Sequence, residues 1–272
     1  HFISNAVMLD DEKAEFCVNL APKRFGFSGL NFIGVSIDGT EETHDVVRAQ
    51  KGAYARSIEG IRNIAKFREK QAKQCPLIHM NTVILDENLD VLPEMPGLAA
   101  EAGVHVLNLL TEMRSMDNQD LGFVDPAVYG PDKIRIRTVD REQLDGALRK
   151  TLENAKKVGV EVRMPRIPYE NILDHYDGGY DLDHMACRSI WTNVYVGSKG
   201  GVYPCWLQNM GNVRENTLTE IWNSPKFQEF RRRRRLGAFE ACRGCCEIEY
   251  TKKKLPGRGE TYPTPAIAGT TA

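Results

Sequence analysis

Four cysteines near the C-terminal end constrain this chain more than any other feature. They are Cys187, Cys205, Cys242 and Cys245, and the last two form a C-x-x-C pair. The segment CRSIWTNVYVGSKGGVYPC joins the first two and predicts a hairpin that turns at Gly200. Four thiolates that converge on one point suit either an iron–sulfur cluster or a structural zinc ion. The sequence therefore predicts a four-cysteine metal site, and the spacing alone leaves both metals open.

The composition narrows the class of protein. The chain has 272 residues, of which 42% are apolar and 27% are charged, and its net charge is -1. This charge gives no indication of a nucleic-acid or membrane partner, and no apolar run approaches the ~20 residues of a membrane span. An odd number of cysteines without a secretory signal favours a reducing, cytoplasmic compartment and metal ligation over disulfides. Cys17 and Cys75 lie in the first half and are expected to be ordinary thiols.

The first half of the chain alternates short apolar runs with amphipathic segments. Strands are predicted at 31–38, 76–85, 104–110 and 160–166, helices at 57–73, 89–103 and 141–159, and one further strand and helix before residue 22. This alternation with short connections predicts parallel strands joined by crossover helices. Segment 111–140 lacks periodicity and is expected to be a long loop at a strand end, where such folds carry functional groups.

The pattern changes after Pro168. Residues 169–187 are polar and rich in turn formers, and we interpret them as a linker. TLTEIWNSPKFQEFRRRRR predicts helix with a break at Pro225. The five arginines at 231–235 are expected to form a solvated helix face beside the metal site, because the run is isolated in a chain without basic excess. The predicted division is a domain at 1–168, a cysteine-rich domain at 169–252 and a tail at 253–272.

These residues together resemble the radical SAM superfamily, in its branch with a C-terminal SPASM or Twitch domain. GVSIDGTEETHDVVRAQKGAYARSIEGIRNI is similar to that family's fourth barrel strand and following helix, with its Ser-x-Asp-Gly and His-Asp-x-x-Arg patterns. The matching residues are Ser36, Asp38, Gly39, His44, Asp45 and Arg48. The four cysteines and Gly200 are similar to the opening of the SPASM motif, and GNVRENTLTEIWNSPKF resembles the segment that links its halves. The resemblance implies an α/β fold, with a (β/α)6 radical SAM barrel and a small cysteine-rich α+β domain.

Two departures from the family pattern modify this expectation. The C-x3-C-x2-C motif that holds the SAM-binding cluster does not occur, and ISNAVML is similar to the third barrel strand. We therefore expect a partial barrel without its first two β/α units, in a fragment that is inactive alone. The SPASM motif also continues with two further cysteines, where this chain has Thr251 and Leu255. Ligands remain for one auxiliary cluster, as in the shorter Twitch type.

The resemblance also implies cofactors and their ligands. Cys187, Cys205, Cys242 and Cys245 would hold an auxiliary [4Fe–4S] cluster, and the complete enzyme would bind S-adenosylmethionine on a second [4Fe–4S] cluster and generate a 5′-deoxyadenosyl radical. No catalytic residue is expected within this chain. Ser36, Asp38, Arg48 and Asn81 are the candidate S-adenosylmethionine contacts. Asp38 could instead cap a turn, and Arg48 could be an ordinary surface arginine. Asn81 could be a core residue whose hydrogen bonds are satisfied within the protein, and the same holds for Asn108 and Glu112. His79 is expected to have a structural role.

The expected partners follow from the family as well. They are a peptide or small-molecule substrate and an electron donor such as flavodoxin or ferredoxin, without nucleic acid or membrane. The alternative is a non-catalytic binding protein with a structural four-cysteine zinc module. A barrel partner whose catalytic cluster comes from another chain is a third possibility. Cys246 is either a substitute for Cys245 or a free buried thiol, and we favour the free thiol.

Overall fold

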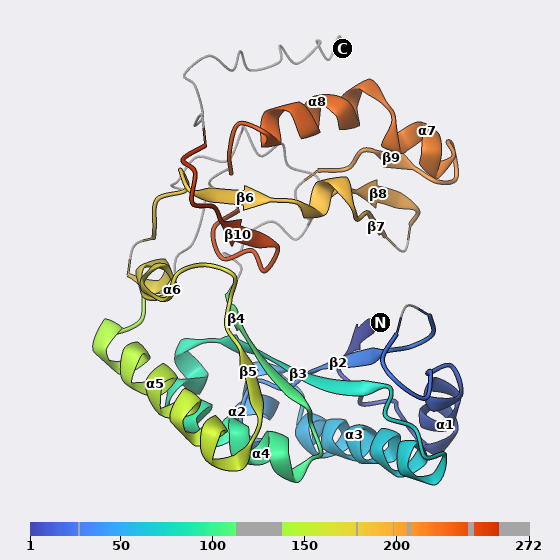
Figure 1. Cartoon of the computed structure of the whole chain (residues 1–272), viewed down its shortest axis with the longest axis vertical. Coiled ribbons are helices and arrows are strands. Elements are labelled where there is room, and N and C mark those ends of the chain that lie inside the picture. The colour runs from blue at the N-terminus through green and yellow to red at the C-terminus, as the bar shows by residue number, and fades with distance from the viewer. Residues whose placement is uncertain are drawn as a thin grey trace. The chain divides into compact units, whose positions relative to one another are not determined.

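The computed structural model describes residues 1–26, 28–112, 138–177, 179–197, 199–205, 208–238 and 242–255 (Figure 1). Contacts within the chain divide these residues into two units. The first unit comprises His1–Glu112 and Val139–Pro165, and the second comprises the described residues from Arg166 onward. Most of the predicted loop at 111–140 and of the predicted tail at 253–272 lies outside the described residues.

A five-stranded parallel sheet organises the first unit, with its strands in the order β1-β2-β3-β4-β5. The strands are β1 (Phe2–Ser4), β2 (Phe32–Ser36), β3 (Leu77–Ile84), β4 (Val106–Thr111) and β5 (Glu161–Arg163). Each strand pairs in parallel with the next one along the chain, as the alternation of strands and helices predicted. Because parallel neighbours need crossover connections, the helices of this unit link one strand to the next.

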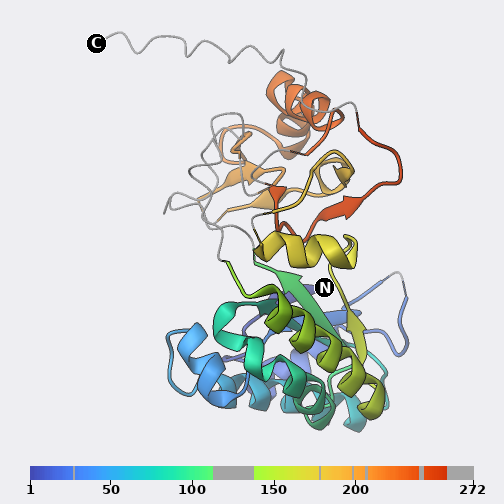
Figure 2. The same ribbon diagram turned by 90° about the vertical axis from the view of Figure 1, so that its left-hand side faces the viewer.

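The helices of the first unit pack on one face of the sheet. They are α1 (Asp11–Asn19), α2 (Glu41–Val47), α3 (Ala53–Lys70), α4 (Met95–Glu101) and α5 (Arg141–Val158), with a 3₁₀ helix η1 (Asp86–Glu94) before α4. Figures 1 and 2 show α3, α4 and α5 along the same side of the strands. Strand residues that point to this side, such as Ile33, Ile78 and Leu107, are 0% exposed. Alternate residues of the same strands, among them Ser36 and Asn81, lie on the other face and are half-buried.

Two local predictions in the first unit need correction. Segment 89–103 is not one helix, because Pro93 and Pro96 divide it into η1 and the short α4. The segment after β2 forms a helix, α2, which begins after Thr40 as its N-cap residue. Asp38 therefore does not cap this helix, and its carboxylate has other partners.

The second unit is built from short strands and short helices. Its elements are α6 (Tyr169–Tyr176), β6 (Met185–Cys187), η4 (Ser189–Trp191), β7 (Tyr195–Val196), β8 (Gly201–Tyr203), β9 (Gly211–Asn212), α7 (Leu218–Trp222), α8 (Pro225–Arg234) and β10 (Ile248–Tyr250). An antiparallel sheet contains β7, β8 and β9, and β6 pairs with β10 in a second antiparallel sheet. The β7–β8 hairpin and the helix break before Pro225 confirm two predictions from the sequence.

The interpretation of residues 169–187 as a linker was wrong. Residues 169–176 form helix α6, in which Ile172, Leu173 and Tyr176 are buried on one side. The last three residues of the segment form β6. Apolar side chains at helical spacing outweigh the polar composition of this stretch, because burial of one face suffices to stabilise a short helix. No helix in the described part of the chain combines the length and apolarity that a membrane crossing requires.

Candidate functional site

Paired short strands and a hairpin hold the predicted metal ligands of the second unit. Cys187 ends β6, and the antiparallel register sets it opposite Ile248 of β10, three residues after Cys245. Cys205 follows the last residue of β8 by two positions. The hairpin turns at Gly200 with φ of +86°, and a Cβ there would lie 2.5 Å from the Asn212 side-chain oxygen. Glycine is therefore required at this turn.

The C-x-x-C pair forms a tight turn that leads into β10. The Cys245 N–H donates to the Cys242 carbonyl at 3.1 Å, and the Ile248 N–H donates to the Cys245 carbonyl at 3.1 Å. Gly244 has φ of +75°, and its N–H donates to the Tyr180 hydroxyl at 3.3 Å. Burial is the main cause that raises the pKa of the Tyr180 hydroxyl, and Cys242 and Cys245 raise it as well. Tyr180 thus lies beside both cysteines and anchors the turn between them.

Arg234 is a buried cation among the cysteines. Its side chain comes from the last turn of α8, the residue is 5% exposed, and Nη1 donates to the Gly237 carbonyl at 2.9 Å. Burial by itself lowers the pKa of Arg234, but Cys242, Cys187 and Cys205 together raise it above its ordinary value. Cys187 also contributes a side-chain hydrogen bond to the guanidinium. One guanidinium therefore has three of the four predicted ligands as electrostatic neighbours.

This position of Arg234 corrects the expectation for the arginine run. Arg232 and Arg235 are exposed, as a solvated helix face requires, but Arg234 is buried and Arg231 is partly buried. A buried guanidinium is stable only with anionic or hydrogen-bonding partners, and the Gly237 carbonyl and the cysteine sulfurs are the partners here. The sequence could not indicate this arrangement, because the partners of Arg234 are distant along the chain.

The donor set fits a metal that prefers sulfur. All seven cysteines are free thiols. Within the described ranges, no three His, Cys, Asp or Glu side chains stand together as a group arranged to hold a metal ion. The four cysteines nevertheless share neighbours, since Arg234 joins three of them and Tyr180 joins Cys242 to Cys245. Four soft sulfur donors from one small unit suit an iron–sulfur cluster or zinc.

The residues that follow the C-x-x-C pair indicate how many further cysteine ligands the second unit can supply. Thr251 and Leu255 occupy the positions of the further family cysteines, and their N–H groups donate to the carbonyls of His184 and Asp183 at 2.7 and 2.8 Å. Cys246 is exposed, so the expectation of a buried thiol was wrong. Its thiol forms a hydrogen bond with Cys245, which lowers the pKa of Cys246. An exposed sulfur next to Cys245 leaves Cys246 open as a substitute ligand.

The open face of the first unit's sheet carries the polar candidates of three neighbouring strands. Ser36 of β2 pairs in register with Asn81 of β3, which pairs with Asn108 of β4, so the three side chains lie on one face. The Asn108 Nδ2 donates to the Asn81 Oδ1 at 2.7 Å. A Cβ on Gly34 would lie 2.7 Å from the Asn81 Nδ2, so glycine at this position makes room for the amide.

Asp38 and Arg48 form an ion pair that fixes the segment after β2. The Arg48 Nη2 lies 2.5 Å from the Asp38 Oδ2, and Asp38 is 2% exposed. The Asp38 Oδ1 accepts from the Val83 N–H at 3.1 Å. Arg48 retains 35% of its side-chain exposure, so part of the guanidinium reaches solvent. The Asp38 carboxylate therefore pairs with Arg48 and with the backbone of β3.

His44, which the sequence placed in the His-Asp-x-x-Arg pattern without a role, is a structural residue of this segment. Its Nδ1 accepts from the Asp38 N–H at 3.1 Å, and the residue is 1% exposed. Burial lowers the pKa of His44, which keeps the ring neutral and able to accept this bond. The Asn88 Nδ2 donates to the Asp38 carbonyl at 2.8 Å from the other side. Histidine in the His-Asp-x-x-Arg pattern thus supports the turn that carries Asp38.

His79 lies on the open face of the sheet and stacks on Phe32, with ring centroids 4.4 Å apart. Burial, followed by the charge of Arg163, lowers the pKa of His79 to about 4. Its Nε2 is buried and has no hydrogen-bond partner among the described residues. A neutral, stacked imidazole agrees with the structural role that we expected for it.

Comparisons with known proteins bear on both units. Residues 187–246 match the family model of the SPASM domain, described as an iron-sulfur cluster-binding domain. The AdoMet-dependent heme synthase of Methanosarcina barkeri is 28% identical over 253 residues, which cover 86% of this chain and 64% of that protein. The sporulation killing factor maturation protein SkfB of Bacillus subtilis is 22% identical over 94% of this chain and 53% of its own length. Residues 187–246 thus carry the SPASM domain, and the chain as a whole is similar to radical SAM/SPASM enzymes.

Solved structures agree with this assignment at the level of the fold. SuiB of Streptococcus suis, in the crystal structure bound to S-adenosylmethionine, superimposes with a TM-score of 0.51 at 14% identity. The match covers 84% of this chain and 49% of SuiB. The chain thus spans about half to two thirds of the length of the relatives that it matches. The chain combines a parallel sheet with a cysteine-rich SPASM domain.

Proposed function

We propose that this chain is part of a radical SAM enzyme and that its second unit holds one auxiliary [4Fe–4S] cluster. The ligands are Cys187, Cys205, Cys242 and Cys245. The observation that carries the proposal is the buried guanidinium of Arg234, which has three of these cysteines as its electrostatic neighbours. A cluster with four thiolate ligands carries net negative charge, and an adjacent buried cation offsets that charge.

Iron–sulfur is favoured over zinc because the matched domain family binds iron–sulfur clusters. When bound, such a cluster supplies one-electron transfer. The residues of the chain hold the ligands in position: the β6–β10 pair supports Cys187, and Tyr180 supports the turn of the C-x-x-C pair. The absence of cysteine at 251 and 255 supports one cluster in this unit. A structural zinc on the same four cysteines, in a binding protein without catalysis, is the competing assignment.

The open face of the first unit's sheet is the proposed site for S-adenosylmethionine. Ser36, the last residue of β2, and Asn81, in the middle of β3, offer a hydroxyl and an amide side by side. Arg48 would pair with the carboxylate of the ligand, because guanidinium and carboxylate bind in a planar, charge-assisted arrangement. Asp38 positions Arg48 for this contact. In a barrel of parallel strands, ligands bind at the carboxyl ends of the strands, and Ser36 is the last residue of β2.

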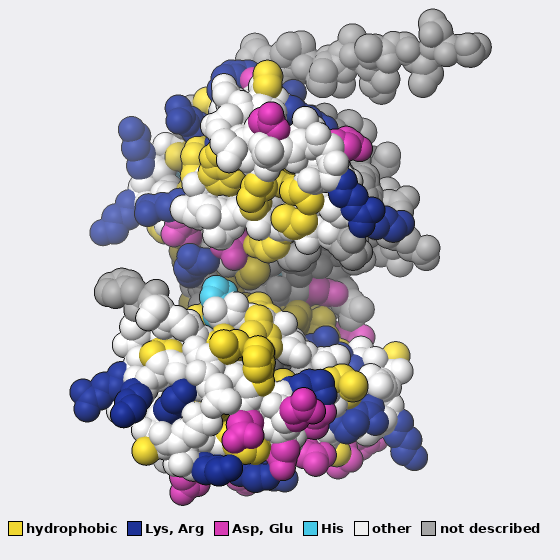
Figure 3. All heavy atoms as spheres, turned by 90° about the vertical axis from the view of Figure 1, so that its right-hand side faces the viewer, with side chains coloured by type: hydrophobic (Ala, Val, Ile, Leu, Met, Phe, Trp, Pro, Cys, Tyr) yellow, Lys and Arg dark blue, Asp and Glu magenta, His cyan; other side chains and the backbone are white. Residues whose placement is uncertain are grey.

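A continued sheet accounts for the exposed apolar surface at the N-terminal edge. β1 is an edge strand, and Ile3 is 66% exposed while Phe16 on α1 is 63% exposed. Figure 3 shows hydrophobic side chains on the surface of the first unit. Unpaired edges and exposed apolar patches favour association. We propose that the strands preceding β1 in the longer relatives complete a (β/α)6 barrel, and that this chain alone is a partial barrel.

The proposed substrate is a peptide or a small molecule, with a peptide favoured. SkfB is named as a maturation protein, and one SuiB structure holds the precursor peptide SuiA. Two other relatives have names that indicate a small-molecule or cofactor substrate. They are the heme synthase and the tungsten-containing aldehyde ferredoxin oxidoreductase cofactor-modifying protein of Pyrococcus furiosus, which is 21% identical. A flavodoxin or ferredoxin is the proposed electron donor, and the proposed compartment is the cytoplasm.

The experiment that tests the proposed function compares this chain with the full product of its gene. Both are purified without oxygen, reduced and supplied with S-adenosylmethionine, and 5′-deoxyadenosine is measured. We expect the full product to form 5′-deoxyadenosine and this chain alone to form none, because no C-x3-C-x2-C motif occurs in it. Formation by this chain alone, or zinc in place of iron in the purified protein, would contradict the proposal.

A variant of the full product tests the proposed ligand contacts. Arg48→Gln should raise the KM for S-adenosylmethionine about tenfold, because one charge-assisted contact is worth about 1.5–3 kcal/mol. Arg62→Gln removes an exposed charge from α3 and is the matched control. An unchanged KM in Arg48→Gln would remove Arg48 from the site and leave the cluster assignment intact.

A further inference from the structure

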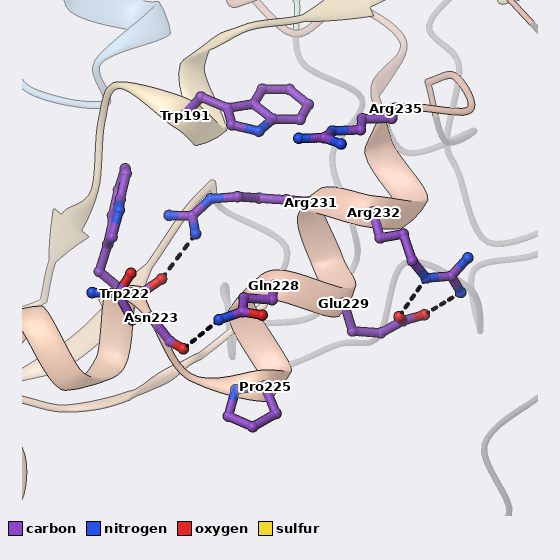
Figure 4. Close-up of a pocket in the computed structure, with 9 residues that line it drawn as sticks. All are labelled: Trp191, Trp222, Asn223, Pro225, Gln228, Glu229, Arg231, Arg232 and Arg235. Atoms are coloured by element: carbon purple, nitrogen blue, oxygen red, sulfur yellow. Dashed lines mark hydrogen bonds and ion pairs between the residues drawn. The ribbon is translucent and has the colours of Figure 1, made fainter.

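The second unit contains a cavity of about 750 Å³ on the side of α8 that carries Arg231 and Arg235 (Figure 4). Its lining comes from η4, α7 and α8, with two indoles, Trp191 and Trp222, and three arginines. This volume falls in the range of sites for small ligands, and aromatic walls with a few polar groups are typical of such sites. Neither the metal ligands nor the candidate S-adenosylmethionine contacts line it.

Arg231 is held rigidly in this cavity and lacks a partner for one nitrogen. Its guanidinium stacks at 4.0 Å on the ring of Trp222 and at 4.0 Å on the ring of Phe227. Nη1 donates to the Trp222 carbonyl at 2.8 Å, and Nε donates to the Ile190 carbonyl at 3.2 Å. Nη2 is buried without a hydrogen-bond partner among the described residues. A buried cationic nitrogen without a partner is costly, so an acceptor at this position is favourable.

The charges around the cavity leave an excess of cations. Glu229 is the one carboxylate of the lining, and it pairs with Arg232, with contacts of 2.7 and 2.8 Å, and with Arg233 at 3.3 Å. Arg231 and Arg235 form no ion pair among the described residues. They stand four positions apart on α8, which sets both on one side of the helix. Figure 4 shows the Arg235 guanidinium near the Trp191 ring.

We propose that this tryptophan–arginine cavity binds a carboxylate carried by a flat apolar or aromatic body. The carboxylate pairs with Arg235 and with the unpartnered Nη2 of Arg231, and the apolar body packs on Trp191 and Trp222. Guanidinium groups bind carboxylates in a planar arrangement, and indole rings bind flat apolar groups. The carboxylate belongs either to a polypeptide or to a free acid. The proposal does not depend on the cluster, because Arg234, the arginine beside the cysteines, does not line the cavity.

Binding to the full chain, purified without oxygen, tests the proposal by titration calorimetry. Three probes separate the possible sources: the peptide acetyl-Phe-Glu-Phe-Glu-amide, its counterpart with glutamine in place of glutamate, and indole-3-acetate. We expect saturable binding of at least one acid and at least tenfold weaker binding of the glutamine peptide. Binding of the acidic peptide alone assigns the site to a polypeptide, whereas binding of indole-3-acetate alone assigns it to a small acid.

Matched variants locate the binding. Arg235→Gln should weaken binding of the preferred acid about tenfold, which equals about 1.4 kcal/mol. Trp191→Ala should weaken it to a similar extent. Arg214→Gln removes an exposed arginine from the same unit, outside the cavity, and should change the affinity less than twofold. Arg231 is left unchanged, because its stacking supports the fold.

Three results would overturn the proposal. They are equal affinity for the acidic and glutamine peptides, an equal loss in Arg214→Gln and Arg235→Gln, and no saturable binding of either acid. Retention of the wild-type metal content in each variant shows that a loss of affinity does not arise from unfolding of the second unit.

Discussion

In the first unit, strands of up to eight residues bury Ile33, Ile78 and Met80 completely between the sheet and its helices. In the second unit the strands have two or three residues, and a buried arginine lies among cysteines. A core of apolar side chains stabilises a fold by itself, whereas short strands around a polar centre need a further constraint. The difference teaches that one chain can combine a unit stabilised by an apolar core with a unit for which we propose stabilisation by metal ligands.

The largest expected effect is the loss of the second unit when its metal is removed. Metal binding by a structural thiolate site contributes on the order of 10 kcal/mol to folding. Chelation, or Cys242→Ala, should therefore abolish hydrogen-exchange protection in the β6–β10 pair and the β7–β8–β9 sheet. Protection of β3 and β4 should stay unchanged, and Cys17→Ala should leave both units as they are. Equal loss in the two units would show that they do not differ in this way.

A substitution that creates a cavity in the apolar core should destabilise the first unit and leave the second unit unchanged. Leu107→Ala removes a side chain that is 0% exposed and should lower the free energy of unfolding of the first unit by about 2–5 kcal/mol. Leu110→Ala, on the other face of the same strand, is half-buried and should cost about 1 kcal/mol or less. Denaturant unfolding followed by circular dichroism measures both, and metal content should be unchanged. Loss of metal in Leu107→Ala would contradict independent stabilisation.

Arg234 tests what holds the centre of the second unit. Arg234→Gln should weaken metal retention by about 1.5–3 kcal/mol, the value of a hydrogen bond to a charged group. It should also lower the reduction potential of a bound cluster, because a positive charge next to the cluster favours the reduced state. Arg232→Gln removes an exposed arginine of α8 that pairs with Glu229 and should cost about 0–1 kcal/mol. Equal effects of the two substitutions would make Arg234 an ordinary helix residue.

The smallest expected effect is a pH dependence confined to the first unit. The folded-state pKa of His79 is about 4, below the ordinary value of 6.5, so the unfolded chain binds more protons between these values. Stability of the first unit should fall as the pH drops from 6.5 toward 4. His79→Phe should remove up to about 2 kcal/mol of this loss at pH 5, measured by denaturant unfolding. Phe32→Leu, which keeps the imidazole, should retain the pH slope, and an unchanged slope in His79→Phe would contradict the assignment.

The same comparison explains how far the sequence predicts the fold. In the first unit, apolar runs predicted β2, β3 and β4, and amphipathic spacing predicted α3 and α5, because burial on one face leaves a periodic pattern. The prediction failed where polar residues cover a short helix, as in α6, and where prolines divide a helix, as at Pro93. Secondary structure in the second unit was harder to predict, since its strands are too short to leave a period.

The candidate site shows a similar limit. The spacing of Cys187, Cys205, Cys242 and Cys245 indicated a metal site, because ligand spacing is a local property of the sequence. The burial of Arg234 and the partnership of Asp38 with Arg48 depend on contacts between distant or differently oriented segments. Charge patterns alone therefore suggested a solvated arginine face and a turn cap, and the three-dimensional contacts replaced both interpretations.

Iron and sulfide content in single cysteine variants tests the central claim most directly. The wild-type chain, prepared without oxygen, should contain about four irons and four sulfides, the content of one [4Fe–4S] cluster. Cys205→Ala should lose nearly all of both, whereas Cys17→Ala should match the wild type. Zinc in place of iron in the wild type, or full retention of iron in Cys205→Ala, would contradict the proposed auxiliary cluster on Cys187, Cys205, Cys242 and Cys245.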